Sequence, residues 1–203
     1  MRNIYYHIVT SLLICFYAYN AVAQRDAYIF PKTSDYTENK PIKTKLIIEQ
    51  RPRGVIALNG GSDFKIYHLM DEELSKKLKK EYFLVMENGN LFVNCIYIGN
   101  KWYGPSFYRN ENYIFFIGGP STLLNYNERA GGGGIIFGGL VAADAATTRY
   151  NYVIDLHKKS IHFVEPEYMK KVFGETELYE RYRKEKNPYL TETVKKYLEE
   201  FYK

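Results

Sequence analysis

Hydrophobic and polar residues alternate most regularly between residues 82 and 118. Asn88-Gly89 lies inside this region and favours the two-residue turn of a β-hairpin. The alternation predicts an antiparallel meander of about four strands, with Cys95 inside the second strand. The four hydrophobic-rich runs span residues 82–87, 90–98, 101–108 and 113–117.

Two further segments have the period of a β-strand. Residues 43–49 alternate in the manner of an edge strand with a charged outer face. Residues 149–156 and 160–164 predict a last hairpin, whose loop length leaves the register open. A two-residue loop places His162 opposite Asp155, and a three-residue loop moves it opposite Ile154.

The helical signals lie at Asp71 and in the C-terminal part of the chain. Asp71 is a suitable N-cap for a helix with an acidic first turn and a lysine-rich last turn, and Pro166 and Gly174 bracket a second helix. Two more helices are predicted at 177–186 and from Thr191 onward. Their amphipathic character indicates that they cover a face or edge of the sheet.

The longest charge-poor stretch after the N-terminus is the Gly/Ala-rich segment, residues 130–148. Small residues recur at every fourth position and would form one stripe of a helix, which permits close backbone packing. We expect a buried helix or strand pair packed tightly on the sheet. Membrane insertion or self-association through the stripe and a flexible loop are the alternatives, and Arg129 and Arg149 are possible partners for Asp144 in this segment. The stripe includes Gly134, Gly138, Ala142 and Ala146.

The N-terminus has the form of a secretory signal peptide. Arg2 is the only charge before Arg25, residues 8–19 are largely apolar, and Ala21-Val22-Ala23 is a small-x-small cleavage site. We therefore predict an exported protein, periplasmic, outer-membrane-associated or secreted, with an uncleaved anchor as the alternative. The domain organisation follows as a signal peptide at 1–23, a poorly ordered lead-in at 24–41 and one domain at 42–203.

That domain is predicted to be of the α+β class. We expect an antiparallel β-meander sheet, partly closed or barrel-like, with the Gly/Ala-rich segment buried and the C-terminal helices covering the sheet. About 180 residues are enough for one domain with a proper core. The net charge of +5 is modest and its basic residues are scattered, which argues against a nucleic-acid partner.

Few residues are candidates for chemistry. Cys95 is the only cysteine after the leader, which excludes an internal disulfide framework, and we interpret it as a buried inert thiol rather than a nucleophile. His157, His162 and Asp155 could form a metal or acid–base site, but solvated or packed histidines are the simpler interpretation. The chain contains no nucleotide-binding, zinc-protease or serine-hydrolase motif, so we predict no enzyme activity and no cofactor or metal.

The meander is rich in aromatic residues, which normally pack across strands. The functional alternative is an exposed aromatic platform that stacks a sugar ring or a peptide, and the residues chosen for it are Trp102, Tyr103 and Tyr108. An envelope protein or a glycan is then the expected partner. Membrane association through residues 130–148 is the alternative.

The Tyr-rich meander, the Gly/Ala-rich segment and Tyr152-Val153-Ile154-Asp155-Leu156 together resemble families of uncharacterised small secreted proteins from Gram-negative bacteria. The resemblance covers the chain from Ile42 onward and implies an envelope or secreted location without assigning any functional residue. We expect a non-enzymatic protein with a binding or assembly role. A membrane-inserting or self-associating protein and a hydrolase or metal-dependent enzyme are the alternatives.

Overall fold

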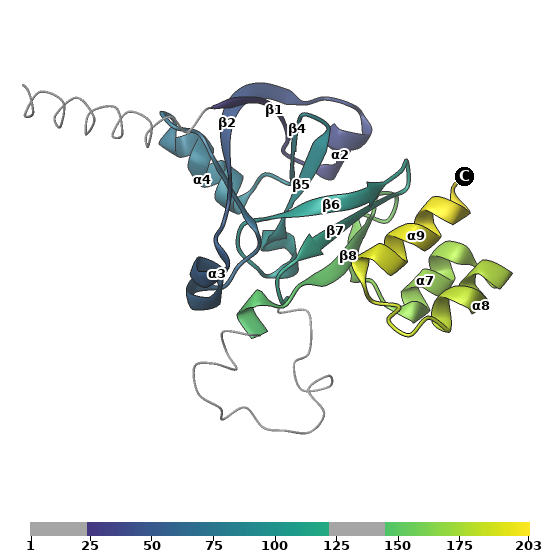
Figure 1. The fold of residues 1–203 in the computed structure, drawn as a ribbon. Helices are drawn as coiled ribbons and strands as arrows, with labels where there is room; N and C mark the ends of the chain where they lie inside the picture. The colour runs from purple at the N-terminus through teal and green to yellow at the C-terminus, as the bar shows by residue number, and fades with distance from the viewer. Residues whose placement is uncertain (1–23, 122–144) are drawn as a thin grey trace, which may run out of the picture.

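The computed structural model describes residues 24–121 and 145–203 (Figure 1). Nine strands form one antiparallel sheet in the order β3-β2-β1-β4-β5-β6-β7-β8-β9. The strands are β1 (Arg25–Phe30), β2 (Ile42–Gln50), β3 (Phe64–Tyr67), β4 (Leu84–Glu87), β5 (Asn90–Asn94), β6 (Tyr103–Arg109), β7 (Tyr113–Gly118), β8 (Tyr150–Asp155) and β9 (Ser160–Phe163). The helices are α2 (Thr33–Thr37), α3 (Arg53–Asn59), α4 (Glu72–Lys80), the 3-10 helix η1 (Cys95–Ile98), α7 (Pro166–Phe173), α8 (Glu177–Arg183) and α9 (Thr191–Phe201).

The first six strands curl into a partial ring. β3 pairs with β6 as well as with β2, through the single bridge Phe64↔Tyr103. Because β7, β8 and β9 continue outward from β6, the sheet as a whole does not close. The predicted α+β class, meander and partial closure are therefore confirmed, and the barrel-like alternative is corrected to a partial ring.

β6 belongs both to the ring and to the outer strands, and its sequence permits this. The pairing register with β7 shifts between Ser106 and Tyr108, which is a bulge that bends the strand. At Gly104 a Cβ atom would lie 1.9 Å from the carbonyl oxygen of Ile117. Only glycine fits this position, because the backbones of β6 and β7 approach too closely for any side chain there.

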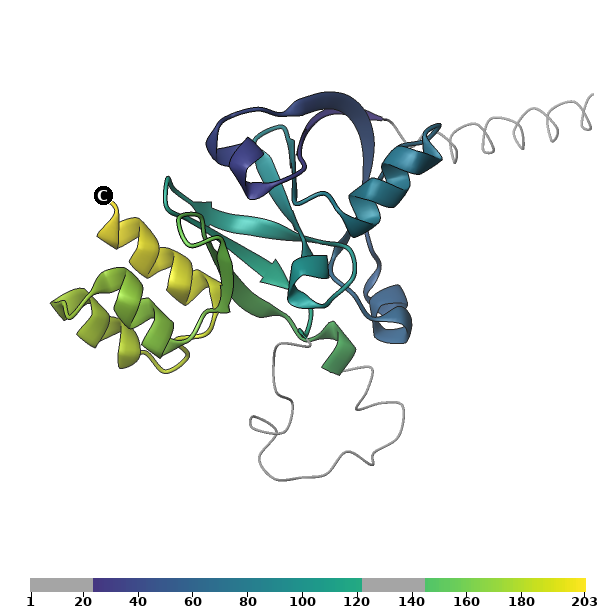
Figure 2. The ribbon, with the colours of Figure 1, turned by 180° about the vertical axis from the view of Figure 1, so that it is seen from behind.

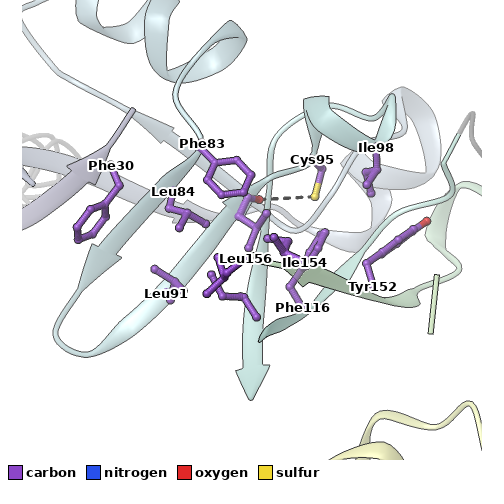
Figure 3. Close-up of a cluster of buried hydrophobic side chains, with 12 residues drawn as sticks. Phe30, Phe83, Leu84, Leu91, Cys95, Ile98, Phe116, Tyr152, Ile154 and Leu156 are labelled. Carbon is purple, nitrogen blue, oxygen red and sulfur yellow. Dashed lines mark hydrogen bonds between the residues drawn. The ribbon is translucent and has the colours of Figure 1, made fainter. Parts of the chain in front are cut away.

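Three hydrophobic clusters follow from this arrangement. The first lies in the ring interior and includes Leu46, Ile66 and Tyr103. The second lies between the outer face of β4–β5 and the strands β7–β8, with Phe116 and Ile154 among its members (Figure 3). The third joins the opposite face of β7–β8 to α7, α8 and α9, which lie beyond these strands as seen from the ring (Figures 1 and 2). The predicted C-terminal covering helices are confirmed.

α4 is anchored inside the ring at its C-terminal end. Its N-cap is Asp71, as predicted, and Leu78 is fully buried in the ring cluster. The carbonyl of Leu78 accepts hydrogen bonds from the Tyr103 hydroxyl at 2.8 Å and from the Asn94 side-chain amide at 2.8 Å. The last carbonyls of a helix have no partner within the helix, and here side chains from two ring strands provide the partners for one of them.

Three local predictions from the sequence were wrong. Residues 25–30 form the strand β1 between β2 and β4 instead of a poorly ordered lead-in, because Ala27 and Ile29 face the ring interior. Cys95 begins the helix η1 rather than lying in a strand, since the Asn94 side chain caps Ile96 and Gly99 ends the turn in the left-handed conformation. Residues 43–49, predicted as an edge strand, lie inside the sheet in β2, which pairs with β1 on one side and β3 on the other.

Most of the Gly/Ala-rich segment, including Gly134, Gly138 and Ala142, lies outside the described residues, whereas Ala146 is half-buried in a helical turn at 145–147. Arg149, proposed as a partner of Asp144, binds Asp63 at 2.8 Å and so attaches the start of β8 to the loop before β3. Across 24–121 and 145–203, no helix has the length and apolarity needed to cross a membrane.

Candidate functional site

A pocket of about 450 Å³ opens on the interior of the ring. Its size falls within the range of small-molecule sites. Every one of the six ring strands contributes to the wall, which makes this ring pocket a product of the whole ring rather than of one loop. The lining residues are Arg25, Ile48, Gln50, Phe64, Glu87, Asn90, Leu91, Phe92, Pro105 and Ser106.

The strand registers explain why most of these side chains converge. Val85 pairs with Phe92 and Glu87 with Asn90, so these four residues share the inner face of the β4–β5 hairpin. Phe92 in turn lies opposite Pro105 on β6. Since side chains alternate between faces, a single set of inward positions runs around the ring.

The wall of the ring pocket is half apolar and half polar by residue type. Phe64 and Phe92 meet edge to face, with ring centroids 4.9 Å apart, and Ile48 packs in the same cluster. Pro105 adds an apolar ring and has no backbone N–H to satisfy. The apolar half of the wall suits the hydrophobic body of a small ligand.

A buried carboxylate stands among these apolar groups. Glu87 is 3% exposed, although acidic residues are rarely buried without a partner. Its Oε1 atom lies 3.7 Å from the Arg25 guanidinium and accepts a 2.7 Å hydrogen bond from the Asn88 side chain. Both of these contacts are made by Oε1, so a hydrogen-bond donor on a ligand could be added at Oε2.

Arg25 compensates Glu87 only in part. Its side chain is 57% exposed, and a separation of 3.7 Å is at the long end for an ion pair. Because Arg25 is largely exposed, solvent screens its charge, and the arginine side chain loses freedom when it pairs. The carboxylate is therefore a buried acceptor whose contacts described above involve only one oxygen, and a hydrogen bond from a ligand would add to them.

The three aromatic residues selected from the sequence do not share one surface. Tyr103 is 1% exposed, and its hydroxyl is used inside the ring. Tyr108 lies on the other side of the sheet, where it stacks on Tyr202 at 5.9 Å and packs against Phe115. Of the three, only Trp102 is partly exposed outside the ring interior and away from the C-terminal helices.

Trp102 has an unusual setting. Its φ angle is +71°, which is rare for a bulky residue, and three cationic side chains surround the indole. Arg51 lies 5.5 Å from the ring centroid, Lys79 5.4 Å and Lys65 6.0 Å. Arg51 also donates hydrogen bonds to the carbonyls of Gly60 and Ser62, so this cluster stabilises the loop between α3 and β3.

The histidines and Asp155 come from the expected hairpin but in a different register. The loop has four residues, so His162 pairs with Val153 rather than with Asp155 or Ile154. His162 stacks on Tyr168 at 4.7 Å and contacts the Ser160 hydroxyl at 2.9 Å, whereas His157 contacts Asn112 at 2.7 Å. Asp155 accepts the backbone N–H groups of His157 and Lys158 and so fixes the turn.

These titratable groups do not form a recognisable reactive centre. Burial, with a smaller contribution from the charge of Lys171, lowers the pKa of His162. Within the described ranges no group of three histidine, cysteine or acidic side chains is placed to hold a metal ion. Cys95 is fully buried, and its burial raises the pKa of the thiol to about 12, which keeps it protonated (Figure 3).

Sequence reasoning missed the ring pocket because its residues come from six separate strands. Glu87 directly precedes the recognised Asn88-Gly89 turn, where an acidic residue is ordinary. One pattern in the sequence could have indicated the ring pocket. Arg25, Ala27 and Ile29 occupy every second position, so a strand places charged Arg25 on the same face as the two apolar residues. Only the pairing of β1 with β4 reveals that Arg25, on this face, lies close to Glu87.

The chain belongs to the family of unknown function DUF6563, whose model matches residues 28–203. The match starts within β1 and so includes almost all of the ring as well as the C-terminal helices. No curated protein and no solved structure is significantly similar to the chain.

Proposed function

We propose that this protein is an exported, non-enzymatic binding protein that holds a small amphipathic ligand in the ring pocket. The ligand has an apolar body, which contacts Phe64 and Phe92, and an ammonium or hydroxyl group, which donates a hydrogen bond to Glu87. The observation that supports this proposal is the buried residue Glu87 in the lining of a pocket of about 450 Å³. An ammonium is favoured over a hydroxyl because a charge-assisted hydrogen bond is about twice as strong.

The location is part of the proposal and rests on the sequence. Residues 1–23 have the charge and apolar pattern of a cleavable leader, and cleavage after Ala23 would leave the whole of β1 in the mature chain. We also place the family among secreted proteins of Gram-negative bacteria, on the resemblance described above. A binding role in the periplasm or outside the cell agrees with a domain without a nucleotide-binding or hydrolase motif.

The alternatives have weaker support. Chemistry at His157, His162 and Asp155 would need these groups to converge, whereas His157 contacts Asn112 and His162 contacts Ser160 and Tyr168. Chemistry at Cys95 would need an accessible thiolate. Self-association or membrane insertion through residues 130–148 remains a prediction, since most of this segment lies outside the described residues.

Isothermal titration calorimetry with three matched probes tests the proposed function. 2-Phenylethylamine, 2-phenylethanol and 3-phenylpropionate share a phenyl group of similar reach but carry a cation, a neutral donor and an anion. We expect the amine to bind most tightly and the acid most weakly. The Glu87→Gln substitution should weaken amine binding by about tenfold or more, because it removes a charge-assisted contact.

Glu49→Gln is the matched control. Glu49 is an exposed acidic residue of β2 on the face opposite to the ring interior, so its substitution should leave all three affinities unchanged. Equal binding of the three probes, or no saturable binding of any of them, would contradict the proposal.

A further inference from the structure

A second cavity lies on the other side of the sheet from the ring pocket. It has a volume of about 280 Å³ and is formed where the β1–α2 connection, the start of β4 and the β8–β9 hairpin meet. We call it the lysine cleft. Its lining residues are Pro31, Lys32, Thr33, Phe83, Tyr97, Ile154, Lys159 and Ile161.

The inner part of the lysine cleft is hydrophobic. Phe83 and Ile154 belong to the core between the ring and β7–β8, and both are at most 5% exposed (Figure 3). Tyr97 extends this surface outward, with its ring edge to face on Phe83 at 5.2 Å. Because the Tyr97 hydroxyl donates to the carbonyl of Glu81, the ring is held in place at the rim.

The outer part of the cleft is positively charged. Lys32 and Lys159 both line it, although they come from segments far apart in the sequence. Both residues are exposed, and neither ammonium takes part in an ion pair within the residues that the structure describes. Lys159 has a φ angle of +52°, an uncommon conformation for a residue with a side chain, within the tight β8–β9 turn.

The neighbouring acidic side chains, Asp35 and Asp155, accept hydrogen bonds from backbone N–H groups. Asp35 accepts the backbone N–H of Lys32 at 2.8 Å, and Asp155 binds the N–H groups of His157 and Lys158 in the hairpin turn. Lys158, next to Lys159 in the chain, lies 3.6 Å from Asp155 and is not part of the cleft lining. The cleft therefore has a hydrophobic floor and two lysines in its lining, and an anionic group placed near both ammonium groups would be attracted by both.

From this juxtaposition we propose that the lysine cleft binds a single-chain amphiphile with an anionic head. The alkyl chain lies on Phe83, Ile154 and Ile161, and the carboxylate or phosphate head pairs with Lys32 and Lys159. The small volume selects a short chain, in contrast to the larger ring pocket, and the positive edge selects the opposite charge. The two sites thus differ in both ligand size and ligand charge.

Titration calorimetry with hexanoate, octanoate, octyl phosphate and octan-1-ol tests this inference on the full protein. Each methylene buried should tighten binding roughly fourfold until the cavity is filled. Octanoate and octyl phosphate should bind at least about tenfold more tightly than octan-1-ol, and this advantage should diminish at high salt. Methyl resonances of Ile154 and Ile161 should shift on titration with octanoate, which locates the site.

Substitutions separate the charge contribution from a general loss of structure. Lys32→Gln and Lys159→Gln should each weaken octanoate binding about tenfold while leaving octan-1-ol binding unchanged. Lys158→Gln, the matched control, should leave octanoate binding within about twofold of the unsubstituted protein. Urea unfolding of each variant confirms that it remains folded.

Three results would overturn the inference: no saturable binding of octanoate, equal binding of octanoate and octan-1-ol, or an effect of Lys158→Gln as large as that of Lys159→Gln. The inference is independent of the proposed function. Binding of 2-phenylethylamine at Glu87 should be unaffected by Lys32→Gln and Lys159→Gln, so failure at one site leaves the other to be judged by its own test.

Discussion

Two side chains donate hydrogen bonds to one carbonyl at the end of α4, and this allows us to predict how their substitutions combine in the free energy of unfolding. The carbonyl of Leu78 accepts from Tyr103 and from Asn94, both at 2.8 Å, and both donors are about 1% exposed. If one donor is removed, the other still satisfies this buried carbonyl. If both are removed, the carbonyl is left without a partner, so the two substitutions should not be additive.

The magnitudes follow from the bonds that each substitution removes. Tyr103→Phe keeps the aromatic ring and deletes the hydroxyl, so it should lower the free energy of unfolding by about 1 kcal/mol. Asn94→Leu removes the bonds to Leu78 and Tyr82 and the cap on Ile96, and should cost about 2 to 3 kcal/mol. The double variant should be less stable than the sum by a further 1 to 3 kcal/mol, roughly the desolvation cost of an unsatisfied buried carbonyl.

Urea unfolding of the four proteins, followed by far-ultraviolet circular dichroism, measures this coupling. Tyr189→Phe is the matched control, because Tyr189 is 57% exposed and its hydroxyl should contribute less than about 0.5 kcal/mol. A double variant whose loss equals the sum of the single losses within about 0.5 kcal/mol would refute the shared-acceptor reasoning.

Three further predictions concern stability and reactivity. Gly104→Ala should destabilise the protein by more than about 3 kcal/mol in urea unfolding, since its Cβ would lie 1.9 Å from the Ile117 oxygen. The control Gly54→Ala has open space around it and should be neutral or stabilising by about 0.5 kcal/mol. Equal effects of the two substitutions would contradict the close approach of β6 and β7. Cys95 should react with a thiol reagent at pH 8 only after denaturant is added, because burial raises the pKa of its thiol to about 12. The test uses a Cys15→Ser variant, in which Cys95 is the one remaining thiol. Rapid reaction of the native protein would show an accessible thiol. The imidazole of His162 should titrate in nuclear magnetic resonance spectra below its ordinary pKa of 6.5. Its neutral form therefore contributes stability above pH 6.5, and this stability is lost as the pH falls through the lower pKa of the folded state. A midpoint at or above 6.5 would show that burial does not control this group.

Local signals in the sequence predict the parts of the fold that depend on neighbouring residues. The Asn88-Gly89 turn, the Asp71 cap and the Pro166–Gly174 helix all appear where their residue types predict them. β1 was missed because Pro31 and the polar residues after it resemble a loop, and its burial comes from strands that follow it in the chain. A strand whose partners are distant in sequence has little local signature of its own.

The candidate site depends on the same distant pairings. Trp102, Tyr103 and Tyr108 are close together in the sequence, yet the Gly104 contact and the bulge in β6 send them to three different environments. Conversely, Arg25 and Glu87 are far apart in the sequence and meet in the ring pocket. Side-chain alternation predicts which face a residue takes only when the strand and its register are known.

The proposed ligand site lies in the ring pocket and ends at the Glu87 carboxylate. Intermolecular nuclear Overhauser effects between 2-phenylethylamine and the labelled protein test it most directly. We expect contacts from the phenyl protons to the rings of Phe64 and Phe92, with the amine-bearing carbon nearest to Glu87. Contacts confined to residues outside the ring pocket would contradict it.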